Sequence, residues 1–216
     1  MILAIIQARM SSVRLPGKVL LPIGGKPILQ WVIEAARAAK LVDSVVVVTS
    51  SEDSDLPISE YCLEHHIPHR AGSLNDVLDR YYRTAIYYKP SHIVRLTADC
   101  PMSDPEIIDL VITDHLIRDN DYTTNSGFPG CYPDGQDVEV FTMDTLTRAA
   151  KLAVDPYERE HLTLYMRNAE MFKVRRVYCP EPTDKKFSVD TRDDYERVKE
   201  EMEECLLNRR NCSSAH

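Results

Sequence analysis

Residues 2–18 read ILAIIQARMSSVRLPGK, and this stretch decides how the rest of the chain is organised. Its first part, ILAIIQ (2–7), is a continuous apolar run, typical of a strand that is buried on both faces of a sheet. The second part carries Arg9, Arg14 and Lys18 without any acidic residue. A buried strand followed at once by cations predicts an anion-binding loop at the carboxyl end of a parallel strand.

Strand-like and helix-like segments alternate along the chain as far as about residue 120. SVVVVTS (44–50) is β-branched and predicts a central parallel strand. Asp104 and Pro105 form a strong helix start, as N-cap and first helical residue. The expected strands are 2–7, 44–50, 67–70 and 91–99, and the expected helices are 26–40, 56–66, 75–88 and 104–116. This order predicts an open, mostly parallel sheet in a three-layer α/β/α, Rossmann-like fold.

The pattern changes after about residue 120, where turn residues become frequent. The segment 126–136 (SGFPGCYPDGQ) predicts a long loop, and DVEVF (137–141) alternates like an edge or antiparallel strand. We also expect strands at 121–125 and 172–178, a short strand before Asp190, and helices at 142–153, 156–168 and 193–207, the last with Thr191 as N-cap. The prediction is a single domain over 1–216, with a small antiparallel insertion in a subsidiary region around 121–180.

Composition limits the classes of function. The chain has 216 residues and a formal net charge of -8, which argues against general nucleic-acid binding. Its apolar runs are all shorter than the roughly 20 residues of a membrane helix, and MILAIIQARM lacks the basic start of a signal peptide. The six cysteines contain no C-x-x-C pair, so reduced thiols are expected. A cytoplasmic protein with no membrane partner is therefore predicted.

Reactive side chains follow several of the expected strands. Ligands of open α/β sheets bind where the carboxyl ends of strands meet, which directs attention to Asp99, Asp190 and the segment from Arg70 to Asp76. Two aspartates at strand ends could hold Mg²⁺, which prefers carboxylate and phosphate oxygens. The cationic loop matches neither a Walker A motif nor a G-x-G-x-x-G fingerprint. The residues therefore favour a phosphate-binding site of another kind.

Several motifs together resemble one known family. QARMSSVRLPGK (7–18) resembles the nucleotide-binding signature of sugar-activating cytidylyltransferases: the CMP-KDO synthetases, the CMP-acylneuraminate synthetases and, most closely, the spore-coat polysaccharide biosynthesis type. RLTADCP (95–101) and VDTRDDYERV (189–198) are similar to the metal-binding and C-terminal segments of that superfamily. GSLNDVLDRYY, DGQDVEVF and PYEREHLTLY extend the similarity over nearly the whole chain.

The resemblance implies a nucleotidyltransferase fold, CTP as substrate, Mg²⁺ as cofactor and a homodimer. The catalytic residues it implies are Arg9, Lys18, Asp99 and Asp190, of which Asp99 and Asp190 would hold the metal. The nucleotide-binding residues it implies are Gln7, Ala8, Arg9, Ser11, Arg14, Lys18, Arg70, Ser73, Asp76 and Thr97. The acceptor-binding residues it implies are Asp137, Glu139, Arg159 and His161.

The expected function is transfer of CMP from CTP to a sugar acid or related acceptor, with release of pyrophosphate, in surface polysaccharide biosynthesis. Two alternatives stay open. One is a glycosyltransferase of related fold that uses a nucleotide-sugar, with Asp99 as its metal ligand. The other is a nucleotide-binding protein without catalytic activity. The cations that follow the first strand weigh against the glycosyltransferase, because a diphosphate-sugar needs less positive charge there than a triphosphate.

Overall fold

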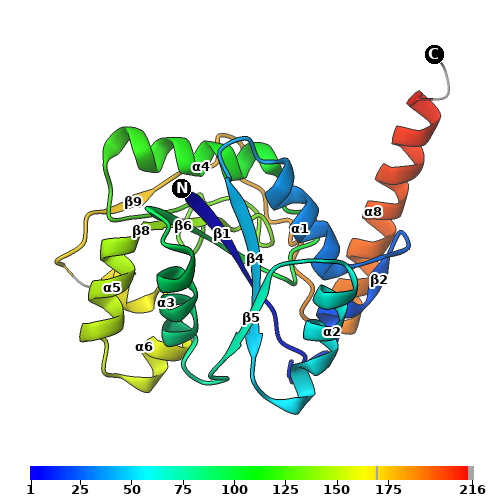
Figure 1. Ribbon diagram of the computed structural model, residues 1–216. Coiled ribbons are helices and arrows are strands. Elements are labelled where there is room, and N and C mark those ends of the chain that lie inside the picture. The colour runs from blue at the N-terminus through cyan, green and yellow to red at the C-terminus, as the bar shows by residue number, and fades with distance from the viewer. Residues whose placement is uncertain (169, 214–216) are drawn as a thin grey trace.

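A seven-stranded sheet forms the centre of the computed structural model, which describes residues 1–168 and 170–213, with side chains up to Asn208. The strand order is β5-β4-β1-β6-β8-β7-β9 (Figure 1). β1 (Ile2–Gln7) lies in the middle and pairs in parallel with β4 (Ser44–Ser50) and β6 (His92–Thr97). β5 (His69–Gly72) adds a further parallel strand beside β4. The predicted mostly parallel sheet is confirmed.

The other end of the sheet contains the predicted antiparallel insertion. β8 (Glu139–Thr142) is antiparallel to β6 on one side and to β7 (Tyr122–Thr124) on the other. It is therefore an interior strand, and β9 (Val174–Arg176) completes the sheet in parallel with β7. A separate hairpin of β2 (Pro22–Ile23) and β3 (Lys26–Pro27) follows the 3₁₀ turn η1 (Lys18–Leu20).

Helices cover both faces of the sheet, because alternate side chains of each strand point to opposite faces. Ala4 and Ile6 of β1 pack in one core with α1 (Ile28–Ala38), α2 (Leu56–Glu64) and α4 (Pro105–Arg118). Leu3 and Ile5 pack in the other core with α3 (Val77–Tyr88), α5 (Met143–Leu152) and α7 (Leu164–Asn168). The three-layer α/β/α architecture is confirmed.

The long C-terminal helix α8 (Arg192–Ser213) packs its first half on the β2–β3 hairpin and extends beyond the body of the molecule (Figure 1). Tyr195, Val198 and Met202 of this helix are buried against Ile23 and Ile28. Within residues 1–168 and 170–213, no helix combines the length and apolarity needed to cross a membrane.

Two expected elements differ from the structure. The single helix expected over 156–168 is two short ones, α6 (Pro156–Glu160) and α7, because His161 leaves helical geometry at φ −90° and ψ 42°. This break lets the Thr163 hydroxyl turn inward and donate to buried Glu139 at 2.8 Å. The short strand expected before Asp190 is only a single bridge between Asp134 and Lys186.

The thiols of the described side chains are free, as expected for reduced cysteines. Cys62 and Cys100 are buried, Cys131 and Cys179 are half-buried, and Cys205 is exposed; Cys212 lies outside the described side chains. Burial raises the pKa of Cys62 to about 12 and that of Cys100 well above its ordinary value. Both buried thiols are therefore protonated and unsuited to nucleophilic attack.

Gly135 allows the loop before β8 to touch the segment before Asp190. Its φ is +100°, and an added Cβ would lie 2.3 Å from the Ser188 nitrogen and 2.5 Å from the Phe187 carbonyl carbon. Gly135→Ala should therefore lower the free energy of unfolding by at least about 2 kcal/mol. Gly25→Ala is the matched control, with φ +83° and no atom within 4 Å of the added Cβ, and should cost about 1 kcal/mol. If urea unfolding showed the same loss of unfolding free energy in both variants, the predicted close contact at Gly135 would be contradicted.

Candidate active site

The cationic loop 8–17 leaves the carboxyl end of β1 and is held by a buried carboxylate. Asp55, at the end of the 3₁₀ turn η2 (Asp53–Asp55), is completely buried. It accepts hydrogen bonds from the backbone N–H groups of Met10 (2.7 Å) and Ser50 (3.1 Å), which join the loop to the end of β4. Gly17, with φ +72°, closes the loop by donating to the Met10 carbonyl at 2.9 Å. The backbone conformation of the loop is therefore fixed by its own contacts.

This loop borders a cavity of about 270 Å³ at the carboxyl ends of β1 and β6. The lining residues come from the loop and its turn, from the two strand ends and from the segment just before α8. They are Gln7, Arg9, Ser12, Val13, Arg14, Lys18, Val19, Thr97, Ala98, Asp99 and Asp190. The structure thus brings together all four residues expected to be catalytic. Gln7, Arg14 and Thr97, which were expected to bind nucleotide, line the same cavity.

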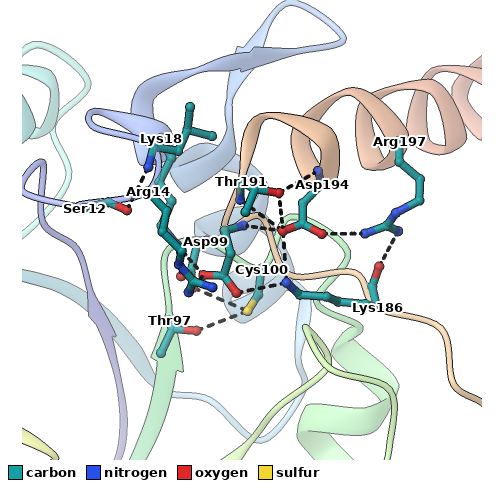
Figure 2. A network of polar contacts seen from close by, with 12 residues as sticks. Ser12, Arg14, Lys18, Thr97, Asp99, Cys100, Lys186, Thr191, Asp194 and Arg197 are labelled. Carbon is teal, nitrogen blue, oxygen red and sulfur yellow. Dashed lines mark hydrogen bonds and ion pairs between the residues drawn. The ribbon is translucent and has the colours of Figure 1, made fainter.

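Lys18 lies between the two aspartates expected to hold a metal. Its Nζ is 2.6 Å from Asp99 Oδ2 and 3.0 Å from Asp190 Oδ1, and its side chain is largely buried. Figure 2 draws Lys18, Arg14 and Asp99 from close by. The neighbouring backbone explains how residues 91 positions apart in sequence become neighbours, since the Val189 N–H donates to the Asp99 carbonyl at 2.9 Å. The cavity floor is therefore one ammonium group shared by two carboxylates.

Asp190 receives two further cations. Arg14 contacts its Oδ1 at 2.9 Å, and Lys186 contacts its Oδ2 at 3.0 Å. Burial raises the pKa of the Asp190 carboxyl, but the hydrogen bonds from Lys18 and Lys186 outweigh burial and hold the pKa below its usual value. Asp190 is thus a carboxylate at neutral pH.

The first turn of α8 fixes Lys186 in place. Asp194 Oδ2 accepts from Lys186 Nζ (2.9 Å) and from the backbone N–H and hydroxyl of Thr191 (3.0 and 2.9 Å). Thr191 Oγ1 accepts in return from the Asp194 N–H at 3.2 Å, which confirms Thr191 as the helix cap. Burial raises the pKa of Asp194, and the bonds from Lys186 and Thr191 lower it well below the usual range. Figure 2 shows this network next to Lys18 and Asp99.

The donor set is chemically suited to a divalent cation. Asp99 and Asp190 converge on one cation, the Lys18 ammonium, with an oxygen each at 2.6 and 3.0 Å. Mg²⁺ typically takes one or two carboxylates and completes its shell with substrate phosphate oxygens and water. Among the described residues, no group of three or more His, Cys, Asp or Glu side chains forms a metal site. Two carboxylates beside Arg14 and Lys18 nevertheless fit a divalent cation whose remaining ligands are water or the oxygens of a bound anion.

Other residues expected to bind nucleotide lie outside the lining of this cavity. Arg70 lies over the Tyr87 ring, with its guanidinium carbon 4.4 Å from the ring centroid. Ser73 Oγ accepts from the Asp76 N–H at 3.0 Å. Asp76 caps α3 by accepting from the Asp79 N–H, and its other oxygen contacts an arginine of α6. Ala8 is buried, while Ser11 is exposed next to the lining residue Ser12.

The expected acceptor-side residues are spread over β8 and α6. The Arg159 guanidinium pairs with Asp76 at 2.8 Å and donates to two carbonyls at the end of α5, so it joins α6 to α3 and α5. His161 is exposed, with its ring 4.2 Å from that of Tyr157. Asp137 is half-buried just before β8. Burial and the nearby Asp134 raise the pKa of Asp137 to about 6.

Glu139 is buried in the interior of the sheet. Its carboxylate accepts from Arg95, Arg167 and Tyr122, and from Thr163 at 2.8 Å. Burial by itself raises the pKa of Glu139, but the charges of Arg95 and Arg167 outweigh it and lower the pKa to about 2. With only 2% of its side chain exposed, Glu139 has no surface with which to contact an acceptor directly.

Two functional residues carried no signal strong enough to single them out in the sequence. Asp55 precedes Leu56 and Pro57, a pattern that suggests a helix cap, and its long-range bond to Met10 has no local signature. Lys186 lies in the charged stretch TDKK, where a solvated lysine is the ordinary interpretation. Only the packing of α8 brings it to Asp190.

A parallel sheet whose strand ends gather cations and two aspartates is the arrangement of a nucleotide-binding α/β protein. A family model described as "Cytidylyltransferase" matches residues 3–210. The chain belongs to the cytidylyltransferase family, and it is a CTP-dependent nucleotidyltransferase. The resemblance seen in the sequence is confirmed, and neither the glycosyltransferase nor the non-catalytic alternative is favoured.

Individual relatives agree with this membership. The chain is 36% identical over 208 residues to the spore coat polysaccharide biosynthesis protein SpsF of Bacillus subtilis, covering 92% of this chain and 85% of that protein. A solved cytidylyltransferase from Leptospira borgpetersenii is 35% identical with a TM-score of 0.86, covering 92% of this chain and 84% of that one. A CMP:2-keto-3-deoxy-manno-octonic acid synthetase, solved with CTP, shares the fold at 20% identity and a TM-score of 0.72, covering 94% and 98%.

Removal of the Asp55 charge should loosen the cationic loop. Asp55→Asn weakens two hydrogen bonds from backbone N–H groups to a buried carboxylate and should lower the free energy of unfolding by about 1 to 3 kcal/mol. The matched control is Asp53→Asn, because Asp53 is exposed in the same 3₁₀ turn. Urea unfolding measures both variants, and a loss no larger than that of the control would show that Asp55 does not hold the loop.

The raised pKa of Asp137 predicts a pH-dependent stability. A carboxyl whose folded pKa is about 6, above its ordinary 3.8, favours the folded state at low pH and loses that contribution as pH rises through 6. As pH rises from about 4 to about 8, the free energy of unfolding of Asp137→Asn should therefore increase by on the order of 1 to 3 kcal/mol relative to that of wild type. Asp144→Asn, at a side chain that is 74% exposed, should gain nothing. Parallel stability curves for wild type and Asp137→Asn would contradict the raised pKa.

Proposed function

We propose that the protein transfers CMP from CTP to a sugar acid or related acceptor and releases pyrophosphate, as a step in surface polysaccharide biosynthesis. The observation that carries the proposal is the convergence of Lys18, Asp99 and Asp190 on one cavity at the carboxyl end of the sheet. The named activities of the relatives support the reaction class.

The cationic loop supplies the triphosphate site in this proposal. Arg9 and Arg14 are 50% and 63% exposed, so both guanidiniums can reach phosphate oxygens, although Arg14 also pairs with Asp190. Lys18 reaches the same space from the cavity floor. A cation near 4 Å from a phosphate oxygen contributes about 4 kcal/mol gross at an effective dielectric near 20, before desolvation. The three cations would stabilise the charge that develops on the leaving pyrophosphate.

Gln7 provides a further reason to expect a ligand here. Its side-chain Oε1 is buried and has no hydrogen-bond partner among the described residues, although Gln7 lines the cavity. A buried acceptor without a partner costs free energy, which a donor group of a bound nucleotide would recover. We place Thr97 beside it, and Arg70, Ser73 and Asp76 farther along the nucleotide, as the family resemblance implies.

Asp99 and Asp190 would hold Mg²⁺, which when bound neutralises phosphate charge and polarises the α-phosphoryl group. Arg14 and Lys18, which contact these carboxylates, would face the triphosphate oxygens from the same cavity. A hydroxyl oxygen of the acceptor attacks the α-phosphorus and gives its proton to solvent. As its bond to phosphorus forms, the bond from the α-phosphorus to the bridging oxygen breaks, and that oxygen leaves with pyrophosphate. The protein orients the two substrates, and none of its side chains forms a covalent bond.

The acceptor approaches in our proposal from the side of β8 and α6. His161 and Asp137 lie on that side with exposed or half-buried side chains. Arg159 holds α6 against α3, and Glu139 organises the arginines beneath it. We assign the region around 121–180 to acceptor binding within one domain, and propose that the protein acts as a homodimer.

Loss of Lys18 or Asp99 tests the catalytic assignment. Lys18→Ala and Asp99→Asn should each lower turnover by at least about a hundredfold while the protein still folds, because each removes charge at the reacting phosphates. Matched controls are Lys185→Ala and Asp144→Asn, at side chains that are 62% and 74% exposed.

The assay is pyrophosphate release from CTP and Mg²⁺ over a panel of sugar acids and phosphorylated acceptors. Near-wild-type release by either variant would remove that residue from the proposed mechanism. A panel without any release, together with binding of UDP-sugars in preference to CTP in a thermal-shift assay, would contradict the proposed reaction itself.

A further inference from the structure

A second cavity, of about 250 Å³, lies beside α6 and α7 and shares no lining residue with the first. Its lining residues are Arg95, Tyr157, His161, Thr163, Leu164 and Arg167. Two arginines and a histidine in so small a space are unusual unless an anion balances them. The proposed phosphoryl transfer in the first cavity uses none of these side chains, whereas His161 lies on the proposed acceptor side.

The charges around the second cavity do not balance. Glu139 is the carboxylate that pairs with Arg95 and with Arg167, so two guanidiniums share one negative charge. The side chain of Glu139 is 2% exposed, whereas those of Arg95 and Arg167 are 21% and 31% exposed. The cations therefore reach the cavity and the carboxylate does not. One net positive charge faces a ligand.

Donor groups also outnumber acceptors here. Arg95 Nε is buried and has no hydrogen-bond partner within the described part of the chain. Glu139 already accepts four hydrogen bonds: Oε1 accepts from Tyr122, Thr163 and Arg167, and Oε2 accepts from Arg95, but not from Arg95 Nε. A planar guanidinium matches carboxylate and phosphate oxygens in geometry as well as in charge. The unbalanced donors therefore point to an anionic group as the ligand.

The second cavity lies close to the first along β6. Arg95 lines the second and Thr97 the first, and residues two apart on a strand face the same side at a spacing of about 7 Å. At the same edge of the sheet, Glu160 of α6 approaches to 4.0 Å from Arg9 of the cationic loop. One small molecule can therefore contact both cavities.

We propose that the second cavity binds an anionic group of the acceptor, a carboxylate or a phosphate, through Arg167 and His161, with Arg95 supporting the site from β6. The identification of the ligand as the acceptor rests on the proposed function. The anion-binding site itself rests on the geometry alone. The acceptor would place its attacking hydroxyl in the first cavity and its anion about 7 Å away, the spacing of those two positions on β6.

Anion binding can be measured without turnover, by NMR of the histidine ring resonances at constant ionic strength. The probes are inorganic phosphate and glucuronate. They are titrated into Lys18→Ala, so that anion binding in the first cavity is weakened and contributes less to the measured shifts. The His161 signal, assigned by its absence in His161→Gln, should shift with one or both probes. Arg167→Lys keeps the positive charge beside Glu139 but loses the planar guanidinium, which can donate two parallel hydrogen bonds. It should raise the dissociation constant of the more tightly bound probe at least about fivefold. Arg83→Gln, at a side chain that is 74% exposed on α3, is the matched control and should change nothing.

The outcomes separate the two proposals. Tighter binding of phosphate supports a phosphorylated acceptor, and tighter binding of glucuronate supports a sugar acid. An unmoved His161 signal, or equal affinity in Arg167→Lys and wild type, overturns the anion site even if pyrophosphate release is found. With an acceptor from the release assay, Arg167→Lys should raise its KM about tenfold and leave the KM for CTP unchanged. An unchanged acceptor KM would show that the anion bound here is not part of the acceptor.

Discussion

The contact on which the active cavity depends is that of one buried ammonium, Lys18, with Asp99 and Asp190. Each aspartate alone would be a carboxylate at the end of a strand or before a helix, and each repels the other. The lysine makes their proximity stable, because a shared cation at hydrogen-bond distance offsets both the repulsion and the cost of burial. The same contact connects three distant parts of the chain, so the site exists only when the turn after β1, the end of β6 and the segment before α8 are all in place.

A second buried charge organises the neighbouring cavity along β6. Glu139 lies in an interior antiparallel strand and receives two arginines, one from β6 and one from α7. Breaking such a pair would leave a buried charge uncompensated, which costs several kcal/mol. The excess of guanidinium over carboxylate is what turns a structural ion pair into a candidate anion site. In the proposed anion site, Arg95 and Arg167 would serve both the buried ion pair and the ligand.

Much of the fold was predictable, since hydrophobic periodicity and cap residues are local signals. The parallel strands and their helices were expected because apolar runs such as SVVVVTS leave little choice of structure. The break at His161 was not, because it serves a hydrogen bond from Thr163 to a residue 24 positions away. The role of Asp55 in holding the cationic loop was not predictable for the same reason, because its partner Met10 is 45 positions away.

The sequence by itself determined the family: QARMSSVRLPGK, RLTADCP and VDTRDDYERV resemble segments of cytidylyltransferases, and a model of that family matches residues 3–210. It also determined the alternation of strands and helices, because each element is encoded by residues close together in the chain. Only the tertiary structure decided which side chains meet. It placed Lys186 on Asp190 and joined Arg95 to Arg167 across Glu139, because such contacts depend on packing between elements that no local pattern records.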